Sequence, residues 1–116
     1  MESNILFFGW NRSIPGREKI SGEHFDDFVA YLAGLQKDGR IESFDTVFLE
    51  QHGGDLNGFI LIHGDGAQLD KLVASDQWTT HQIRAMLHLT SVGAIRGVTG
   101  DAARQRMKLW KKHLPA

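Results

Sequence analysis

The sequence predicts a single α+β domain in which a four-stranded sheet carries helices on one face. Three observations favour this fold class: short apolar runs of strand length, two segments with helical periodicity, and a Gly-Gly pair between two of the runs. The chain has 116 residues and a mass of 13.0 kDa, which is the ordinary size of one domain with one core. Its 41% hydrophobic and 23% charged residues are typical of a soluble globular protein.

The first strand is predicted at residues 5–10, where an apolar and aromatic run ends at a polar group, residues 11–13. A helix is predicted over residues 24–37, and Gly39 suits its C-terminal end. Its start is open, because either Ser21 caps the helix or the helix begins at Pro15 and includes Ser21 and Gly22. The helical stripe recurs at steps of three and four residues: Phe25, Phe28, Leu32 and Leu35.

Residues 41–52 and 56–63 are predicted to form the second and third strands, joined by a hairpin. Gly53 and Gly54 lie between them, and primed hairpin turns need the positive φ angles that glycine adopts. With these two glycines as the turn, four pairs face each other: His52 and Asp55, Glu50 and Asn57, Phe48 and Phe59, Phe44 and His63. One face then carries Phe44, Phe48, Phe59 and Leu61, and the other Val47, Leu49, Leu56, Ile60 and Ile62. A three-residue turn would exchange the faces of one strand.

The second half of the chain repeats the helix and strand pattern. Leu69, Leu72 and Val73 predict a short helix after residues 64–66, and Ser75 with Asp76 marks a fresh cap before a helical piece that carries Trp78, Ile83 and Met86. Residues 88–98 alternate loosely and predict the fourth strand. Asp101 is expected to cap a last helix over residues 102–113, which Pro115 ends. The resulting strand-helix-strand-strand-helix-strand order is that of the ferredoxin-like α+β sandwich, with the last helix as an addition.

The predicted sheet is apolar on both faces, and the helices cover only one of them. A chain of this size does not leave an apolar sheet face in water, so a second copy is expected to cover it and form a homodimer. Residues 1–100 are therefore predicted to be a ferredoxin-like domain of a dimeric α+β barrel. Residues 101–116 are predicted to be a basic helix that packs on this domain or on the dimer partner.

Charge and composition exclude several classes of function. The net charge is −1, and residues 101–116 carry +4 against −5 in the rest, so nucleic acid is not an expected partner of the acidic body. Met107, Trp110 and Leu114 recur at helical spacing in the basic segment, which indicates packing rather than binding to nucleic acid or a membrane surface. The sequence has no cysteine, no apolar run of membrane-spanning length and no signal-peptide pattern, so a cytoplasmic protein is expected.

Three segments together resemble a known group of proteins. Residues 8–12 (FGWNR), 15–18 (PGRE) and 49–59 (LEQHGGDLNGF) are similar to those of a group of small uncharacterised bacterial proteins in the dimeric α+β barrel superfamily. The resemblance covers most of residues 5–98 and implies a homodimer with one pocket in each subunit. The superfamily includes cofactor-free oxygenases, lactone isomerases, dehydratase-like proteins, haem enzymes and ligand binders, so the resemblance leaves the reaction open.

The first candidate site consists of Trp10, Asn11, Arg12 and Arg17 around a predicted helix start. Unpaired backbone N–H groups at a helix N-terminus, together with two guanidinium groups, favour a carboxylate or phosphate ligand. The alternative is that both arginines form ordinary surface pairs, for instance with Glu18.

The second candidate site is the hairpin, where His52 is predicted to be a catalytic base oriented by Asp55. The pKa of an imidazole lies near neutrality, and Glu50 and Asn57 share a face with His52 in the predicted register. The alternative is a tight turn whose polar side chains satisfy the backbone. The predicted walls of a substrate pocket are Phe44, Phe48 and Phe59, with His63 at its far end.

These sites predict a pocket for a small, partly apolar compound that carries a carboxylate or a carbonyl group. One hypothesis is a cofactor-independent enzyme of the oxygenase, isomerase or dehydratase type, and the other is a non-catalytic ligand-binding or interaction module. No metal is expected, because no two histidines have ligand spacing on one element. Haem is not expected either. It needs a proximal histidine on a helix, and His81 is the one histidine in the second helical piece, where the short helices leave little room for the macrocycle. His24 and His113 are expected to be solvated.

Overall fold

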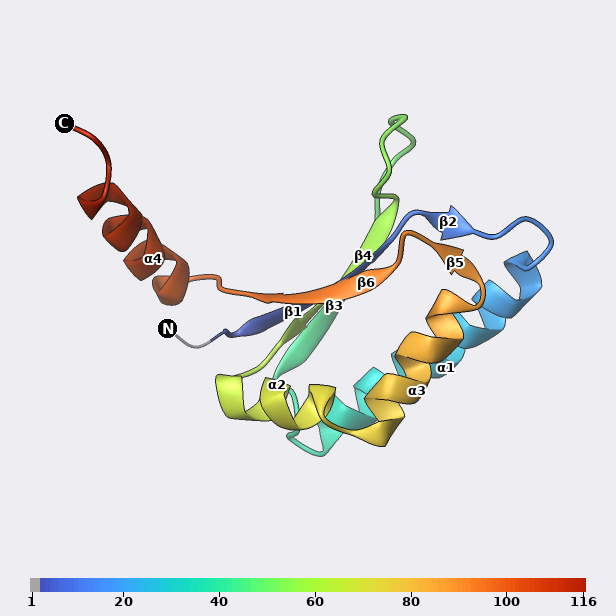
Figure 1. The fold of residues 1–116 in the computed structure, drawn as a ribbon. Coiled ribbons are helices and arrows are strands. Elements are labelled where there is room, and N and C mark those ends of the chain that lie inside the picture. Colours follow the sequence, from blue (N-terminus) through green and yellow to red (C-terminus); the bar gives the residue numbers. More distant parts are fainter. Residues whose placement is uncertain (1–2) are drawn as a thin grey trace.

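A four-stranded antiparallel sheet organises the fold (Figure 1). The computed structural model describes residues 3–116. The sheet consists of β1 (Ile5–Trp10), β3 (Ser43–Phe48), β4 (Gly58–His63) and β6 (Gly93–Gly97), in the order β3-β4-β1-β6. The chain therefore has the predicted ferredoxin-like α+β fold.

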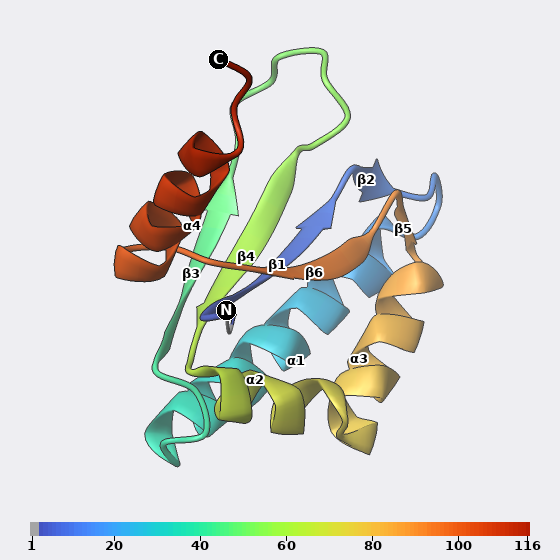
Figure 2. The same cartoon turned by 60° about the vertical axis from the view of Figure 1, so that its left-hand side comes forward.

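Three helices cover one face of this sheet: α1 (Glu18–Lys37), α2 (Gly66–Val73) and α3 (Asp76–Met86) (Figure 2). Helix α1 begins at Glu18 and continues through Ser21 and Gly22, which agrees with the earlier of the two predicted starts. Ser75 caps α3 as predicted, because its side chain accepts a hydrogen bond from the Trp78 backbone N–H. The core between helices and sheet is apolar and consists of Leu6, Phe8, Phe28, Leu32, Leu35, Ile41, Ile60, Ile62, Leu69, Leu72, Trp78 and Ala85.

The register of β3 on β4 differs by one residue from the prediction. Phe48 lies opposite Gly58, and Phe44 lies opposite Ile62. β3 ends earlier and β4 begins later than predicted, so residues 49–57 form a long loop instead of a two-residue turn. Because a shift by one residue exchanges the faces of a strand, the predicted face assignment of β4 was wrong. Ile60 and Ile62 point into the core, whereas Phe59 and Leu61 lie on the uncovered face.

The predicted fourth strand is divided in two. Ser91 has a φ of 49°, in the left-handed region, and the chain turns there. Before this turn, β5 (Leu89–Thr90) pairs with the short strand β2 (Arg12–Ser13), and after it β6 pairs with β1. The small β2–β5 sheet brings the segment that follows β1 against the segment that follows α3.

The last helix, α4 (Asp101–Lys112), lies apart from the helix layer (Figure 1). Gly100, with a φ of 66°, is its N-cap residue, so the prediction that Asp101 caps the helix was wrong by one residue. Every residue of α4 is at least partly exposed. Where its apolar side chains pack stays a prediction. Among the residues that the structure describes, none of the helices is both long and apolar enough to span a membrane.

Candidate functional site

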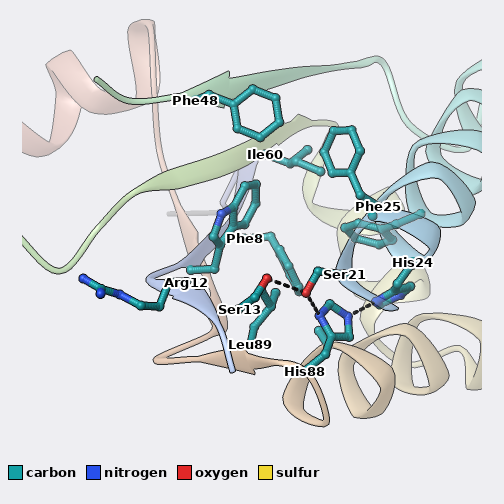
Figure 3. Close-up of a pocket in the computed structure, with 14 residues that line it drawn as sticks. Phe8, Arg12, Ser13, Ser21, His24, Phe25, Phe48, Ile60, His88 and Leu89 are labelled. Carbon is teal, nitrogen blue, oxygen red and sulfur yellow. Dashed lines mark hydrogen bonds between the residues drawn. The ribbon is translucent and has the colours of Figure 1, made fainter. Parts of the chain in front are cut away.

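A cavity of about 340 Å³ lies between α1 and the covered face of the sheet (Figure 3). Most of its wall is aromatic or aliphatic, and its polar groups come from β2, from α1 and from the segment that follows α3. The apolar lining residues are Phe8, Trp10, Gly22, Phe25, Phe28, Phe48, Ile60, Ala85 and Leu89, and the polar ones are Arg12, Ser13, Ser21, His24 and His88. Such a cavity suits a small ligand with an apolar body and one or two polar groups.

Aromatic rings fix the shape of this cavity. The ring of Phe48 lies 6.2 Å from that of Trp10 and 5.5 Å from that of Phe25. Deeper in the core, the ring of Phe8 packs on Phe28 at 5.0 Å. Because aromatic pairs of this kind have preferred offset or edge geometries, they hold the wall in one arrangement.

A continuous row of hydrogen bonds runs from the cavity into the helix layer, and Figure 3 shows the part from Ser13 to His24. The Oγ atoms of Ser13 and Ser21 are 2.7 Å apart, and Ser21 Oγ lies 2.7 Å from His88 Nδ1. His88 Nε2 is 2.7 Å from His24 Nδ1, and His24 Nε2 is 3.0 Å from His81 Nδ1. We refer to these five residues as the serine–histidine chain.

The three imidazoles of this chain are neutral at neutral pH. Burial, reinforced by the positive charge of Arg84, lowers the pKa of His24 to about 4, and the neighbouring histidines act in the same direction. Burial and then Arg84 also lower the pKa values of His81 and His88. A neutral imidazole has one N–H donor and one acceptor nitrogen, which is what an unbroken row of hydrogen bonds requires.

The fold positions each member of the chain by a local device. Ser21 and His24 are three residues apart in α1, so they lie on the same face of the helix. His88 follows the end of α3, where its N–H bonds to the Ala85 carbonyl and its own carbonyl accepts from the Ile14 N–H at 2.8 Å. The pairing of β2 with β5 therefore places Ser13 and His88 at the same end of the cavity.

The structure brings two members of the first predicted site to the cavity and leaves the other two outside its lining. Trp10 and Arg12 line the cavity. Asn11 donates to the Asp55 carbonyl and accepts from Thr90 Oγ1 at 3.0 Å, so it ties loops together. Arg17 donates to the Leu87 carbonyl.

The geometry of the hairpin loop favours the turn-stabilising alternative for His52. Its Nδ1 accepts from the Gly54 N–H at 3.1 Å, and its Nε2 donates to the Leu56 carbonyl at 2.7 Å. Asp55 contributes its backbone carbonyl, which accepts from Asn11 and from Asn57 at 3.5 Å. Both His52 and Asp55 are exposed and outside the cavity lining, so their catalytic role stays a prediction that this geometry does not support.

The predicted aromatic walls divide between the two faces of the sheet. Phe48 lines the cavity, and Phe44 packs against the core on the same face. Phe59 and His63 lie on the opposite face, where His63 Nε2 is 3.2 Å from an Asp45 carboxylate oxygen. Glu50 is exposed in the loop. This division follows from the one-residue register difference.

The sequence analysis missed four residues of the serine–histidine chain that line the cavity: Ser13, Ser21, His24 and His88. The expectation that His24 is solvated was wrong, because its side chain is only 4% exposed. A signal for it existed, since His24 lies one turn before Phe28 on the buried stripe of α1. His88 lies just beyond a helix end, where no periodicity indicates burial.

The three imidazoles lie in a row instead of around one point. His24 contacts His88 through Nδ1 and His81 through Nε2. Within residues 3–116, the structure has no group of three or more side chains placed to hold a metal ion. The arrangement suits proton transfer between neighbouring rings.

Fold and cavity together define a class: a ferredoxin-like α+β domain with a small-molecule cavity between helix and sheet. In fold, the chain is similar to SnoaB, a cofactor-independent oxygenase from Streptomyces nogalater, with a TM-score of 0.50 and 15% identity. The similarity covers 84% of this chain and 96% of SnoaB, and at this identity it shows the fold alone. No family model and no curated protein matches the sequence, so membership of the narrower bacterial group stays a prediction.

Proposed function

We propose that this protein is a cofactor-independent enzyme that moves a proton on a small, mainly apolar carbonyl compound bound in the cavity. The observation that carries the proposal is the pair Ser21 and His88 at the cavity wall, with 2.7 Å between Oγ and Nδ1. A neutral imidazole bonded to a hydroxyl group accepts the hydroxyl's own proton, so that the hydroxyl oxygen can take a proton from a substrate. Both residues lie next to apolar surface, where such a transfer is shielded from competing water.

The chemistry needs no further reactant when it is an isomerisation. A C–H bond next to the carbonyl group breaks, and its electron pair forms an enolate. The proton passes to Ser21 Oγ as the Ser21 hydroxyl proton passes to His88 Nδ1, and a proton returned to another carbon of the enolate completes the reaction. Arg12 is a lining residue whose guanidinium group points away from the other lining side chains, with Nε donating to Asn11 Oδ1 at 3.1 Å (Figure 3), and a rotation toward the substrate would let its charge stabilise the enolate oxygen. SnoaB supports this proposal to the extent that a similar fold carries out chemistry without a cofactor.

The second candidate function is a non-catalytic ligand-binding module. It is favoured by the saturation of His88, whose two ring nitrogens already have partners in Ser21 and His24. In that case the serine–histidine chain would stabilise the core and the cavity would only hold a ligand. The two functions differ in whether a bound carbonyl compound reacts.

The isomerisation of 3-cyclohexen-1-one to its conjugated isomer separates the two functions. The product absorbs in the ultraviolet, so the rate is followed directly. We expect the protein to accelerate the reaction, and Ser21→Ala to lower the rate about a hundredfold, because a general acid–base contribution has that size. Ser43→Ala, a serine at the start of β3 outside the cavity lining, serves as the matched control and is expected to keep the rate. Binding of 3-cyclohexen-1-one without acceleration would overturn the enzyme proposal and support the binding module.

We also propose that the protein is a homodimer formed through the uncovered face of the sheet. On this face the rings of Phe7 and Phe59 stack at 4.9 Å, and Ile95 is 69% exposed beside Phe7. An apolar sheet face of this kind is normally covered. The exposed apolar side chains of α4, among them Met107 and Trp110, are then available to the partner subunit.

A further inference from the structure

We propose that His24 and His81 form a proton relay that releases one proton at the surface for each proton that Ser21 takes from the substrate in the cavity. This inference rests on the proposed function, because the relay begins at the Ser21–His88 pair. Beyond that pair, His88 Nε2 lies 2.7 Å from His24 Nδ1, and His24 Nε2 lies 3.0 Å from His81 Nδ1. Both distances are within the range of hydrogen bonds between ring nitrogens.

The relay works without placing a lasting charge in the core. As His88 gains a proton on Nδ1, it gives the proton on Nε2 to His24 Nδ1. His24 then gives its Nε2 proton to His81 Nδ1, and His81 releases its Nε2 proton to water. At each ring one N–H bond forms and one breaks, so every imidazole is neutral again when the transfer ends. This matters because a buried imidazolium is costly to maintain.

One ion pair lies near the outer end of the chain. Asp27 of α1 and Arg84 of α3 form an ion pair at 2.8 Å near His81, and the Asp27 carboxylate raises the pKa values of His24 and His81 against the lowering effects. At the cavity end, burial and Arg84 both act to lower the pKa of His88. The Asp27 carboxylate therefore opposes the lowering of the pKa at His24 and His81 and is not among the causes that act on His88.

His81 is the natural exit of this relay. Both ring nitrogens of His24 and of His88 are engaged within the chain, whereas His81 Nε2 has no hydrogen-bond partner among the described residues. The His81 ring is partly exposed and stacks between His24 at 5.3 Å and Tyr31 at 4.6 Å. This packing holds the ring in the orientation that the bond from His24 needs.

A second hollow, of about 280 Å³, offers a rival exit. His24 and His88 form part of its wall, opposite the cavity, together with Arg17, Ile20, Arg84 and Leu87. If water in this hollow accepted protons from His24 or His88, His81 would be dispensable. The two routes are distinguished by replacing His81 alone.

The test is the rate of isomerisation of 3-cyclohexen-1-one, measured with and without imidazole added to the solution. The proton that leaves the relay comes from His81 Nε2, so removing this ring stops the release of protons to water. We expect His81→Ala to lower the rate, and we expect added imidazole to restore it by taking the proton from His24 Nε2 in the space that the ring leaves. The wild-type rate is expected not to respond to imidazole.

A second variant and a control complete the experiment. Asp27→Asn removes the carboxylate that raises the pKa of His81 against the lowering effects, and the Asp27 side chain is exposed, so a smaller loss of rate with the fold intact is expected. His113→Ala, at the exposed end of α4, is expected to keep the wild-type rate. A wild-type rate in His81→Ala, or a loss of rate that imidazole does not restore, would overturn the relay and leave the proposed function standing. An absence of isomerisation in the wild type would instead overturn the proposed function, and the relay with it.

Discussion

His24 is an unusual core residue, because both of its ring nitrogens are bonded to other imidazoles. It is 4% exposed, and His88 is 3% exposed. Within residues 3–116, every buried side-chain nitrogen and oxygen atom has a hydrogen-bond partner. The burial of these polar rings is therefore compatible with a stable core as long as the rings stay neutral.

This requirement predicts that the protein loses stability as the pH falls from about 6.5 toward about 4. In the unfolded chain the histidines bind a proton near their ordinary pKa of 6.5, whereas burial lowers the pKa of His24 to about 4 in the folded protein. Between these values the unfolded state binds more protons, so the free energy of unfolding decreases as the pH decreases. For His24 alone the loss is on the order of 3 kcal/mol. Urea unfolding between about pH 7 and about pH 4.5 measures it.

The contribution of His24 is isolated by comparing two variants. His24→Phe keeps a ring in the core but removes the titrating group, so its stability is expected to depend less on pH in this range. The variant is also expected to be less stable at pH 7, because it leaves His88 Nε2 and His81 Nδ1 without a partner. His113→Phe, on the surface, should keep the wild-type dependence. Equal pH dependence in His24→Phe and in the wild type would contradict the assignment.

At the scale of the elements, periodicity and cap residues predicted the main helices and strands, but they did not predict β2 or the division of the fourth strand into β5 and β6. The first strand, the buried stripe of α1 and the Ser75 cap all depend on local patterns. The register of β3 on β4 was not predictable in this way. It depends on a loop that is held by contacts with a distant segment, since Asn57 Nδ2 donates to the Asn11 carbonyl at 2.7 Å.

The candidate site was less predictable than the fold for the same physical reason. Trp10, Arg12 and Phe48 lie in segments that the sequence predicts to be part of a site, and all three line the cavity. The polar chain, in contrast, joins Ser21 and His24 to His88, more than sixty residues further along. No local pattern reports a hydrogen bond between residues so far apart. The pairing of β2 with β5 and the packing of α1 on α3 bring them together.

β1 and β4 pack closely beside the cavity, so a side chain added at Gly58 is expected to lower the stability of the fold. This glycine lies opposite Trp10, and a Cβ atom there would be 2.6 Å from the Trp10 ring and 3.0 Å from the Val47 backbone oxygen. Since a Cβ atom at 2.6 Å overlaps the Trp10 ring, Gly58→Ala is expected to displace Trp10 and to destabilise the fold by about 1–3 kcal/mol. Urea unfolding and Trp fluorescence measure the two effects.

A control for this prediction is Gly34→Ala, on the exposed side of α1. A Cβ atom at Gly34 would meet open space, and its φ angle is not in the left-handed region. The stability of this variant is therefore expected to be at least that of the wild type, because alanine is the better helix former. If both alanine variants were equally stable, close packing of Trp10 on Gly58 would not be what positions the cavity wall.

At the scale of the whole molecule, the chain is more extended than one compact domain. Its Cα radius of gyration is 16.0 Å, whereas a compact domain of this length is expected to have about 13 Å. Helix α4 projects from the edge of the sheet, and the loop between β3 and β4 projects beyond its end (Figures 1 and 2). Together with the uncovered apolar face, this shape is what one half of a dimer is expected to have.

The proposed dimer predicts that a charge on the uncovered face separates the subunits. Ile95 lies beside Phe7 on that face, so Ile95→Asp would place a carboxylate in the interface, at a cost of several kcal/mol if it stays unpaired. Native mass spectrometry is expected to find the wild type at twice the 13.0 kDa mass of the chain and Ile95→Asp at the single mass. Ile83→Asp introduces the same charge on α3, in the helix layer, where the side chain is 53% exposed, and it should stay dimeric. A monomeric wild type, or an Ile95→Asp variant that remains dimeric, would show that this face is not the interface.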